Sequence, residues 1–369
     1  MLFTLQELEI KYKDSNSTKY FKYWKSICEF MENEPDEHSI GWALTRVNLR
    51  DIDRMKLLIK LPFVIVGYVI NFIDVYGYKT ISATKNWWDV FFVMAGFRSN
   101  SWIFLKDNTK FELTKSDFGK LHSRIELVNL RKRRPDIKIN TADGKVHIPV
   151  GNKIIKVAKE SAVDISRELD SSIYNGFDVK DKIVVDIGGY IGDTAILFLL
   201  KRGATHVYAY EPFTEIYNIA KKTIDTNKLA NRITFLNEAV AGNGGFADIN
   251  NNTRICSMVS PLKSNNTGKL IPVVTLDDVV EKLKLKDGAA LKVDCEGAEY
   301  KMFANVSSRA LKKFHIIYLD YHYGYKTLIE RLKKEGYSVE YTNPTYQFHL
   351  LSSGKGTMAL GRIIAKLNV

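Results

Sequence analysis

The second half of the chain alternates between short apolar runs and longer segments with helical spacing. Seven apolar runs predict strands, at Ile183–Ile187, His206–Tyr210, Ile233–Leu236, Ala290–Val293, His315–Leu319, Tyr337–Tyr341 and Met358–Lys366. Segments such as Thr194–Lys201 and Lys326–Glu335 have the apolar spacing of helices. Regular alternation of strands and helices predicts an α/β fold with a mostly parallel seven-stranded sheet and helices on both faces.

The part of the chain before this domain has a different pattern. Residues 1–125 are rich in aromatic side chains at mixed spacing, and Asn86–Gly96 carries helix start and stop signals, so we expect a mainly helical region. Short apolar runs separated by turn residues between Trp102 and Val157 predict β-hairpins. We therefore expect a helical region over 1–125, a connecting β-hairpin segment over 126–170 and the α/β domain over 171–369.

The positive charge of the chain is diffuse. The sequence has 54 Lys and Arg against 42 Asp and Glu, a net charge of +12, and residues 1–150 and 151–369 contribute +6 each. The densest basic run, Arg131–Arg134, precedes a proline and lacks interleaved aromatic residues, which predicts a solvent-exposed turn. We therefore expect no nucleic-acid partner, whereas an acidic small molecule, a glycan or an anionic membrane surface is compatible with this charge.

Cysteine content and hydropathy indicate a cytoplasmic protein. Cys28, Cys256 and Cys295 are odd in number and far apart, which favours neither disulfides nor a zinc site. The N-terminus lacks the basic start and cleavage site of a signal peptide. The uncharged run Leu61–Ile73 is shorter than the roughly 20 residues of a membrane-spanning helix, so it predicts a buried element, with a peripheral contact at the cytoplasmic membrane face as the alternative.

The first strand-to-helix turn of the α/β domain is a candidate ligand site. Ligands of such sheets bind beyond the carboxyl ends of the strands, where the strand order reverses. The turn runs from Asp186 to Thr194 as DIGGYIGDT, and Tyr190 stands where the dinucleotide fingerprint requires glycine, so NAD fits poorly. A carboxylate at Asp186 suits an ammonium group such as that of S-adenosylmethionine. Asp193 or Thr194 is expected to cap the following helix.

A second acid marks the next strand end. Glu211 lies 23 residues after Gly188 and immediately before Pro212. A carboxylate there can accept hydrogen bonds from both hydroxyls of a ribose. The spacing therefore predicts a nucleoside-binding site.

Polar side chains also follow the fourth and fifth strands. Strand alternation predicts Lys292, Asp294 and Glu296 on one side, with Asp320 and His322 on one side of the neighbouring strand. These five residues are the predicted catalytic group. His322 or Asp294 as general base is the interpretation we favour. A divalent cation held by the carboxylates and the imidazole is the functional alternative, and no metal ligands are assigned.

A structural role for the same residues stays open beside these functions. In that interpretation Lys292 pairs with Asp294, Glu296 caps the next helix and His322 is a structural histidine. The position of the group at the carboxyl ends of the strands favours chemistry over this alternative.

Four segments in order, VVDIGGYIGDTAILF, GATHVYAYEP, TLDDVV and LKVDCEGAEY, make residues from about 160 to 365 resemble the FkbM family of S-adenosylmethionine-dependent methyltransferases. The resemblance implies a class I methyltransferase (Rossmann-like) fold and O-methylation, often of sugar or polyketide hydroxyls. It places Asp186, Gly188 and Gly192 around the methionine part of the cofactor, Thr194 near its carboxylate and Glu211 on the ribose. The predicted cofactor-binding residues are Asp186, Gly188, Gly189, Tyr190, Gly192, Thr194, Glu211, Pro212 and Glu238, the last beside the adenine.

These observations predict an S-adenosylmethionine-dependent O-methyltransferase that acts on a glycan, glycolipid or other small molecule with a hydroxyl. One alternative is a methyltransferase of RNA or protein, which the basic charge permits. The other is a non-catalytic methyltransferase-like interaction module, which would be expected to lose the acids at the strand ends.

Overall fold

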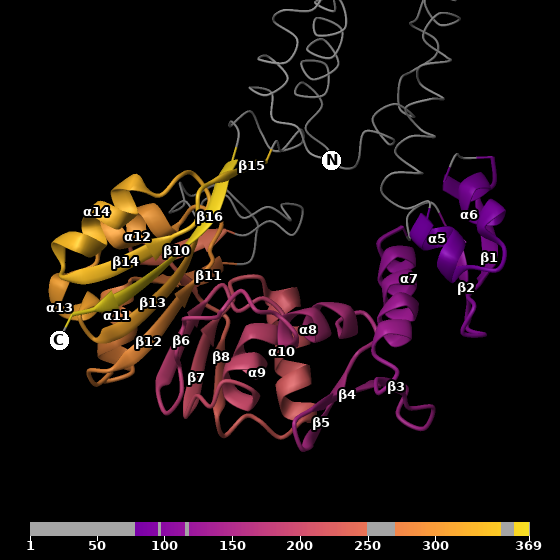
Figure 1. Cartoon of the computed structure of the whole chain (residues 1–369), viewed down its shortest axis with the longest axis horizontal. Coiled ribbons are helices and arrows are strands. Elements are labelled where there is room, and N and C mark those ends of the chain that lie inside the picture. Colours follow the sequence, from indigo (N-terminus) through magenta and orange to yellow (C-terminus); the bar gives the residue numbers. More distant parts are fainter. Residues whose placement is uncertain (1–77, 95–96, 115–117, 249–269, 348–357, 369) are drawn as a thin grey trace, which may run out of the picture. The chain divides into compact units, whose positions relative to one another are not determined.

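The computed structural model describes residues 78–94, 97–114, 118–248, 270–347 and 358–368 (Figure 1). The chain divides into two compact units, residues 1–137 with 349–355 and residues 138–348 with 356–369. The apolar run at residues 61–73, together with Cys28 and Cys256, lies outside the described residues.

The described part of the first unit contains helices α5 (Tyr78–Ala83), α6 (Trp87–Met94) and α7 (Phe118–Arg133), and strands β1 (Asn100–Phe104) and β2 (Lys110–Thr114). The two strands pair as an antiparallel hairpin, which confirms the predicted one. Their inward side chains, among them Ile103 and Leu113, form a small core with residues of all three helices. The predicted helix after Asn86 is confirmed as α6.

Helix α7 corrects two expectations. The helix continues to Arg133, so residues 126–137 belong to the first unit and not to a connecting segment. The basic run at Arg131–Arg134 is exposed at Lys132 and Arg133 as expected, but it is helical and not a loop turn, because Arg131, Lys132 and Arg133 form the last turn of α7. Cations are favoured at that end of a helix, and Arg131 also pairs with Asp107 at 3.0 Å.

The second unit begins with the predicted hairpins and continues into the α/β domain. Strands β3 (Lys138–Ile139), β4 (Val146–Val150) and β5 (Lys153–Val157) form a small antiparallel sheet, and helix α8 (Ala162–Leu169) follows.

The main sheet has the strand order β14-β16-β13-β12-β6-β7-β8, with β15 (Thr345–Gln347) attached to β16. Its strands are β6 (Ile183–Ile187), β7 (His206–Tyr210), β8 (Ile233–Leu236), β12 (Ala289–Val293), β13 (Phe314–Tyr321), β14 (Tyr337–Tyr341) and β16 (Met358–Leu367). The neighbours from β13 to β8 are parallel, and β16 runs antiparallel to β13 and β14. The predicted mostly parallel seven-stranded sheet is confirmed.

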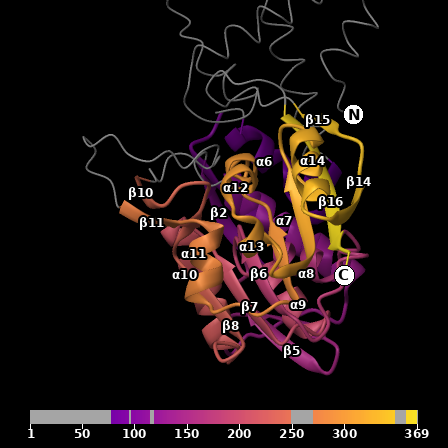
Figure 2. The same cartoon turned by 90° about the vertical axis from the view of Figure 1, so that its left-hand side faces the viewer.

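Helices cover both faces of this sheet (Figure 1, Figure 2). One layer contains α9 (Asp193–Leu200) and α10 (Thr214–Thr226) beside α8, and the other contains α11 (Leu276–Lys282), α12 (Glu299–Asn305), α13 (Ser308–Leu311) and α14 (Lys326–Lys334). Side chains such as Val185, Leu291 and Leu319 pack under the second layer. On the opposite face the ring of Tyr318 packs against those of Tyr174 and Phe177 in a tilted arrangement, at centroid distances of 4.6 and 5.7 Å.

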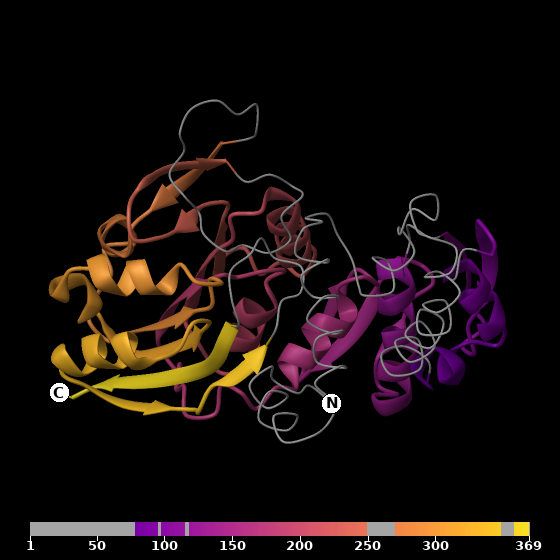
Figure 3. The ribbon, with the colours of Figure 1, turned by 90° about the horizontal axis from the view of Figure 1, so that it is seen from above.

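A small sheet leaves the main one after β8. It has the order β10-β11-β9, with β9 (Ala239–Val240), β10 (Gly245–Asp248) and β11 (Leu270–Val274), and it extends away from the main sheet (Figure 2, Figure 3). No helix among the described residues is long and apolar enough to cross a membrane.

The strand order reverses between β6 and β12, and a buried ion pair joins these two strands. Asp186 and Lys292 are register partners in adjacent parallel strands, with relative exposures of 0% and 1%. The ammonium of Lys292 lies 3.1 Å from Asp186 Oδ1 and donates to the carbonyl of Gly188 at 2.7 Å. Burial alone would lower the pKa of Lys292, but Asp186 and Asp294 outweigh it and hold the pKa above its usual value. The lysine is therefore charged and pairs with Asp186, not with Asp294 as the structural alternative expected.

We expect Lys292→Met to lower the free energy of unfolding by about 3–5 kcal/mol, because it leaves the Asp186 carboxylate buried without its counter-charge. Urea denaturation at pH 7 measures this change. The double variant Asp186→Asn/Lys292→Met should regain part of the loss.

Lys282→Met is the matched control. Lys282 pairs with Glu238 at 2.8 Å, but its side chain is 50% exposed, so its removal should cost at most about 1 kcal/mol. Equal losses in the two single variants would contradict a special role for the buried pair.

Candidate active site

The turn after β6 needs glycines because neighbouring residues leave no room for side chains there. Gly188 has φ +79°, and a Cβ built on it would lie 1.8 Å from the carbonyl oxygen of Asp294. A side chain at Gly189 would press on Ala209 and Phe235 at 3.1 Å. The glycines therefore allow the turn to pack directly against the ends of β12 and the neighbouring strands.

Tyr190 and Gly192 complete this turn. Tyr190 has φ +44°, an unusual value for a residue with a side chain, and its ring is 46% exposed. Gly192 has φ +82° and is the N-cap of α9. The cap has no side-chain hydrogen bond, so neither Asp193 nor Thr194 caps the helix as expected.

Thr194 and Asp193 have other partners. The Thr194 hydroxyl donates to Asp186 Oδ2 at 2.5 Å, and its backbone N–H donates to Asp193 Oδ1 at 3.0 Å. Burial and the nearby Glu168 raise the pKa of Asp193 to about 7. Asp186 is thus held between Thr194 and Lys292 with no exposed surface, and its contact with the cofactor stays a prediction.

Glu211 lies at the end of β7 and is fixed by the backbone. Its Oε2 accepts from the N–H of Tyr190 at 3.1 Å and its Oε1 from the N–H of Phe213 at 2.9 Å. Its exposure is 5%, and burial raises the pKa of Glu211 to about 7 in spite of these bonds. Pro212 follows directly, and Asn237 donates to its carbonyl at 2.9 Å.

Glu238, expected beside the adenine, has a partner in the protein. Its carboxylate lies against the Lys282 ammonium, with oxygen distances of 2.8 and 3.1 Å. Asn237, the residue before it, bonds the backbone after β7 and receives a hydrogen bond from Thr214 at 2.9 Å. The structure therefore gives Glu238 an ion-pair role, and contact with adenine stays a prediction.

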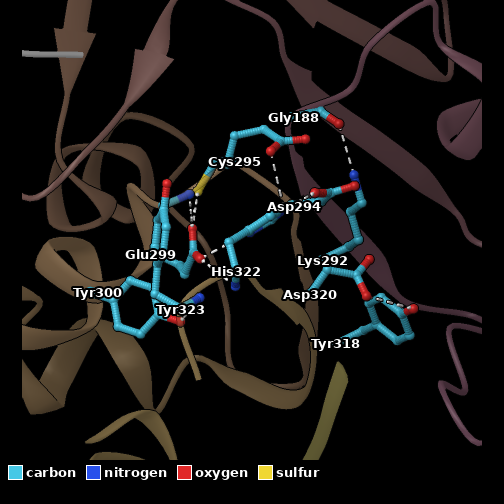
Figure 4. A network of polar contacts seen from close by, with 12 residues as sticks. Gly188, Lys292, Asp294, Cys295, Glu299, Tyr300, Tyr318, Asp320, His322 and Tyr323 are labelled. Carbon is cyan, nitrogen blue, oxygen red and sulfur yellow. Dashed lines mark hydrogen bonds and ion pairs between the residues drawn. The ribbon is translucent and has the colours of Figure 1, made fainter. Parts of the chain in front are cut away.

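Three of the predicted catalytic residues converge beyond β12 and β13, and Figure 4 shows two of them, Asp294 and His322, next to each other. Asp294, Glu296 and His322 each offer one ligand atom, and these atoms lie within 4.8 Å of one another. His322 Nε2 is 3.6 Å from Asp294 Oδ1 and 3.4 Å from Glu296 Oε2. Burial opposes the charged ring, but Glu299 and the two carboxylates outweigh it and raise the pKa of His322 to about 9.

The convergence does not come from strand alternation. Strand β12 ends at Val293, and Glu296 has φ +52°, so the backbone turns before it. The turn brings Glu296 back toward His322, whereas Lys292 remains on the buried face with Asp186.

Asp320 stands apart from this group. Its Oδ1 accepts from the Tyr318 hydroxyl at 3.2 Å. Burial, with Asp294 nearby, raises the pKa of Asp320 to about 7. Figure 4 shows Asp320 beside Tyr318 and Lys292, so it belongs to the buried side of the site.

Glu299 organises the group and was not among the predicted site residues. It begins α12 with no exposed surface, and its Oε1 lies 3.0 Å from His322 Nδ1 and accepts from the His322 backbone N–H at 3.2 Å. Its Oε2 accepts from the N–H of Gly297 at 2.7 Å. Glu296 therefore does not cap the helix. The sequence feature that could have identified Glu299 is its position as the second acid of CEGAEY, at the first residue of a helix.

Two tyrosines border the same group. The Tyr323 backbone N–H donates to the Tyr300 hydroxyl at 2.7 Å, which donates to the Gly324 carbonyl at 2.6 Å. The Tyr323 ring is 44% exposed, and a side chain at Gly297 would collide with it at 2.7 Å. The accessible edge of the site thus carries an aromatic ring next to His322.

The chain has weak similarity to several solved structures. Solved structures with similar folds include methyltransferase FkbM from Methylobacillus flagellatus KT, with 13% identity, a TM-score of 0.35 and coverage of 67% of this chain and 54% of that one. Another is TYW2 from M. jannaschii in complex with AdoMet, with 16% identity, a TM-score of 0.33 and coverage of 61% and 87%.

The family comparison covers the strands that build the site. The family model described as "Methyltransferase FkbM domain" matches residues 186–342, from the end of β6 to just beyond β14. The match includes the turn after β6, Glu211, and the group around His322. The recognition made from the sequence is confirmed over residues 186–342, which match the FkbM methyltransferase domain, and the strand order confirms the predicted class I (Rossmann-like) sheet.

Proposed function

We propose that this methyltransferase transfers the methyl group of S-adenosylmethionine to a hydroxyl of a glycan, glycolipid or other small molecule. One observation carries the proposal. A backbone-fixed buried acid, Glu211, and a group of polar side chains around His322 lie at the carboxyl ends of strands on opposite sides of the strand-order reversal. This is the place where a sheet of this topology binds its ligands.

The hydrogen bonding of Glu211 supports the proposed binding of the methyl donor. Each carboxylate oxygen accepts one backbone N–H, which leaves further lone pairs for the two hydroxyls of a ribose. The bonds to Tyr190 and Phe213 hold the carboxylate still, so little side-chain entropy is lost when a ribose binds.

Asp186 has a different role from the one expected. Because Lys292 and Thr194 occupy its carboxylate, we propose that it positions the glycine turn and does not contact the cofactor ammonium. The turn then offers its backbone to the methionine part of the cofactor, as the resemblance of Gly188 and Gly192 implies.

The acceptor end must position an oxygen in line with the sulfonium methyl group and take up its proton. The new C–O bond forms as the C–S bond breaks, the thioether leaves with the electron pair, and the hydroxyl proton passes to the protein. Asp294 and Glu296 suit this end because their side chains are 39% and 47% exposed, unlike the buried acids around Lys292.

We expect Glu211→Gln to weaken S-adenosylmethionine binding at least about tenfold, because hydrogen bonds to a charged group are worth about 1.5–3 kcal/mol. Calorimetric titration measures the dissociation constant. Glu215→Gln is the matched control, an exposed acid in the first turn of α10, and should bind normally. Silence of the wild type in this titration would refute the proposed donor.

The binding of S-adenosylmethionine should also weaken as the pH falls below 7. The pKa of Glu211 in the folded protein is raised to about 7, so its carboxylate gains a proton as the pH falls through that value and loses acceptor strength. In titrations between pH 5.5 and 8.5, the dissociation constant of S-adenosylmethionine should change less with pH for Glu211→Gln than for the wild type. Asp193 has a similar pKa, and Asp193→Asn measures its share. If Glu211→Gln kept the pH dependence of the wild type, a group other than Glu211 would be its cause.

We expect Asp294→Asn to lower methyl transfer at least about 100-fold, the usual range for loss of acid–base catalysis, with cofactor affinity within about threefold of wild type. The assay follows a radiolabelled methyl group into glycan, lipid, RNA and protein fractions. Asp287→Asn is the control, because Asp287 is exposed at the opposite end of β12. Label found only in RNA or protein would refute the small-molecule acceptor while leaving the donor in place.

A further inference from the structure

We infer that Asp294, Glu296 and His322 bind a divalent cation of the Mn²⁺ or Mg²⁺ type. The inference deepens the proposed function, since the ion would lie at the acceptor end of the same site, but ion binding itself is independent of the methyl donor.

The spacing of the three side chains fits one ion. Octahedral ligands about 2.1 Å from an ion lie roughly 3 to 4 Å from one another. His322 Nε2 is 3.4 Å from Glu296 Oε2 and 3.6 Å from Asp294 Oδ1. A cation can therefore enter between the three atoms without a large movement of the backbone.

The imidazole supplies an observation separate from the carboxylates. The His322 side chain is only 7% exposed, and its Nδ1 faces Glu299 at 3.0 Å. A carboxylate only accepts, so Nδ1 keeps its hydrogen, and a bound cation would displace the second ring hydrogen from Nε2 and take that nitrogen as its ligand atom. Nε2 makes no hydrogen bond to a residue that the structure describes, and its contacts there are with the carboxylates of Asp294 and Glu296, at 3.6 and 3.4 Å. A carboxylate behind a histidine is the arrangement that orients metal-binding imidazoles.

Charge and donor type also favour a hard divalent ion. Glu299 adds a third carboxylate behind His322, while the ammonium of Lys292 on β12 pairs with Asp186. The thiol of Cys295 contacts Glu299 Oε2 at 3.6 Å and is not one of the three converging ligands. Two carboxylates and one imidazole suit Mn²⁺ or Mg²⁺, whereas a zinc site would be favoured by thiolate ligands, which this group lacks.

The partial exposure of Asp294 and Glu296 leaves coordination positions open to water or to an acceptor hydroxyl. A hydroxyl bound to such an ion loses its proton at a lower pH than a free one. The ion would thus supply the activation that the acceptor needs.

The experiment titrates the full-length chain, stripped with EDTA, with Mn²⁺ alone and follows free Mn²⁺ by electron paramagnetic resonance. We expect one site that Asp294→Asn and Glu296→Gln each weaken at least about tenfold. Glu299→Gln, which changes only the residue behind the imidazole, should weaken binding about tenfold as well. Asp287→Asn should bind as wild type does. Circular dichroism and thermal unfolding of each variant check the fold.

The outcomes separate this inference from the proposed function. No Mn²⁺ site, or one that Asp287→Asn weakens as much as Asp294→Asn does, overturns the cation site, whereas the calorimetric titration with S-adenosylmethionine still tests the donor. A Mn²⁺ site with the expected variant pattern supports the inference even in a chain that does not bind S-adenosylmethionine. Methyl transfer that is unchanged after EDTA treatment rejects the role of the ion in catalysis.

Discussion

The buried pair between Asp186 and Lys292 is the interaction on which the site depends. It joins β6 and β12, the two strands between which the strand order reverses, and the same ammonium holds the carbonyl of Gly188. A charge with so little exposure is tolerated only when its partner is close, so the two strand ends and the glycine turn are held together. Gly188 adds a second constraint, because its missing side chain allows the turn to pack directly on Asp294.

The two ends of the site differ in their access to solvent. Glu211 and Asp193 are buried and Asp320 is half-buried, and burial raises the pKa of each to about 7. Asp294 and Glu296 remain partly exposed around His322. Fixed buried acids suit recognition of one invariant molecule, such as a nucleoside cofactor, because their geometry does not have to change. Partly exposed side chains suit the approach of an acceptor that enters and leaves.

Much of this organisation follows from the sequence. The strand and helix periodicities predicted the seven strands and their alternation with helices, since a two-sided parallel sheet leaves near-continuous apolar runs. The segments around Gly188, Glu211 and Asp294 predicted which turns carry polar chemistry. The acids singled out at these turns, Asp186, Glu211 and Asp294, all lie at carboxyl ends of parallel strands.

What the sequence determined was therefore the order of the elements and the positions of the polar turns, because periodicity and glycine spacing are local properties. Only the tertiary structure decided which side chains interact with one another in the site. Lys292 pairs with Asp186, 106 positions away, and not with Asp294 beside it, because adjacent strands place them in register. His322 is oriented by Glu299, 23 positions earlier in the chain, because the turn after β12 and the start of α12 place that carboxylate beside the imidazole. Such choices depend on distances across the sheet, which no local pattern encodes.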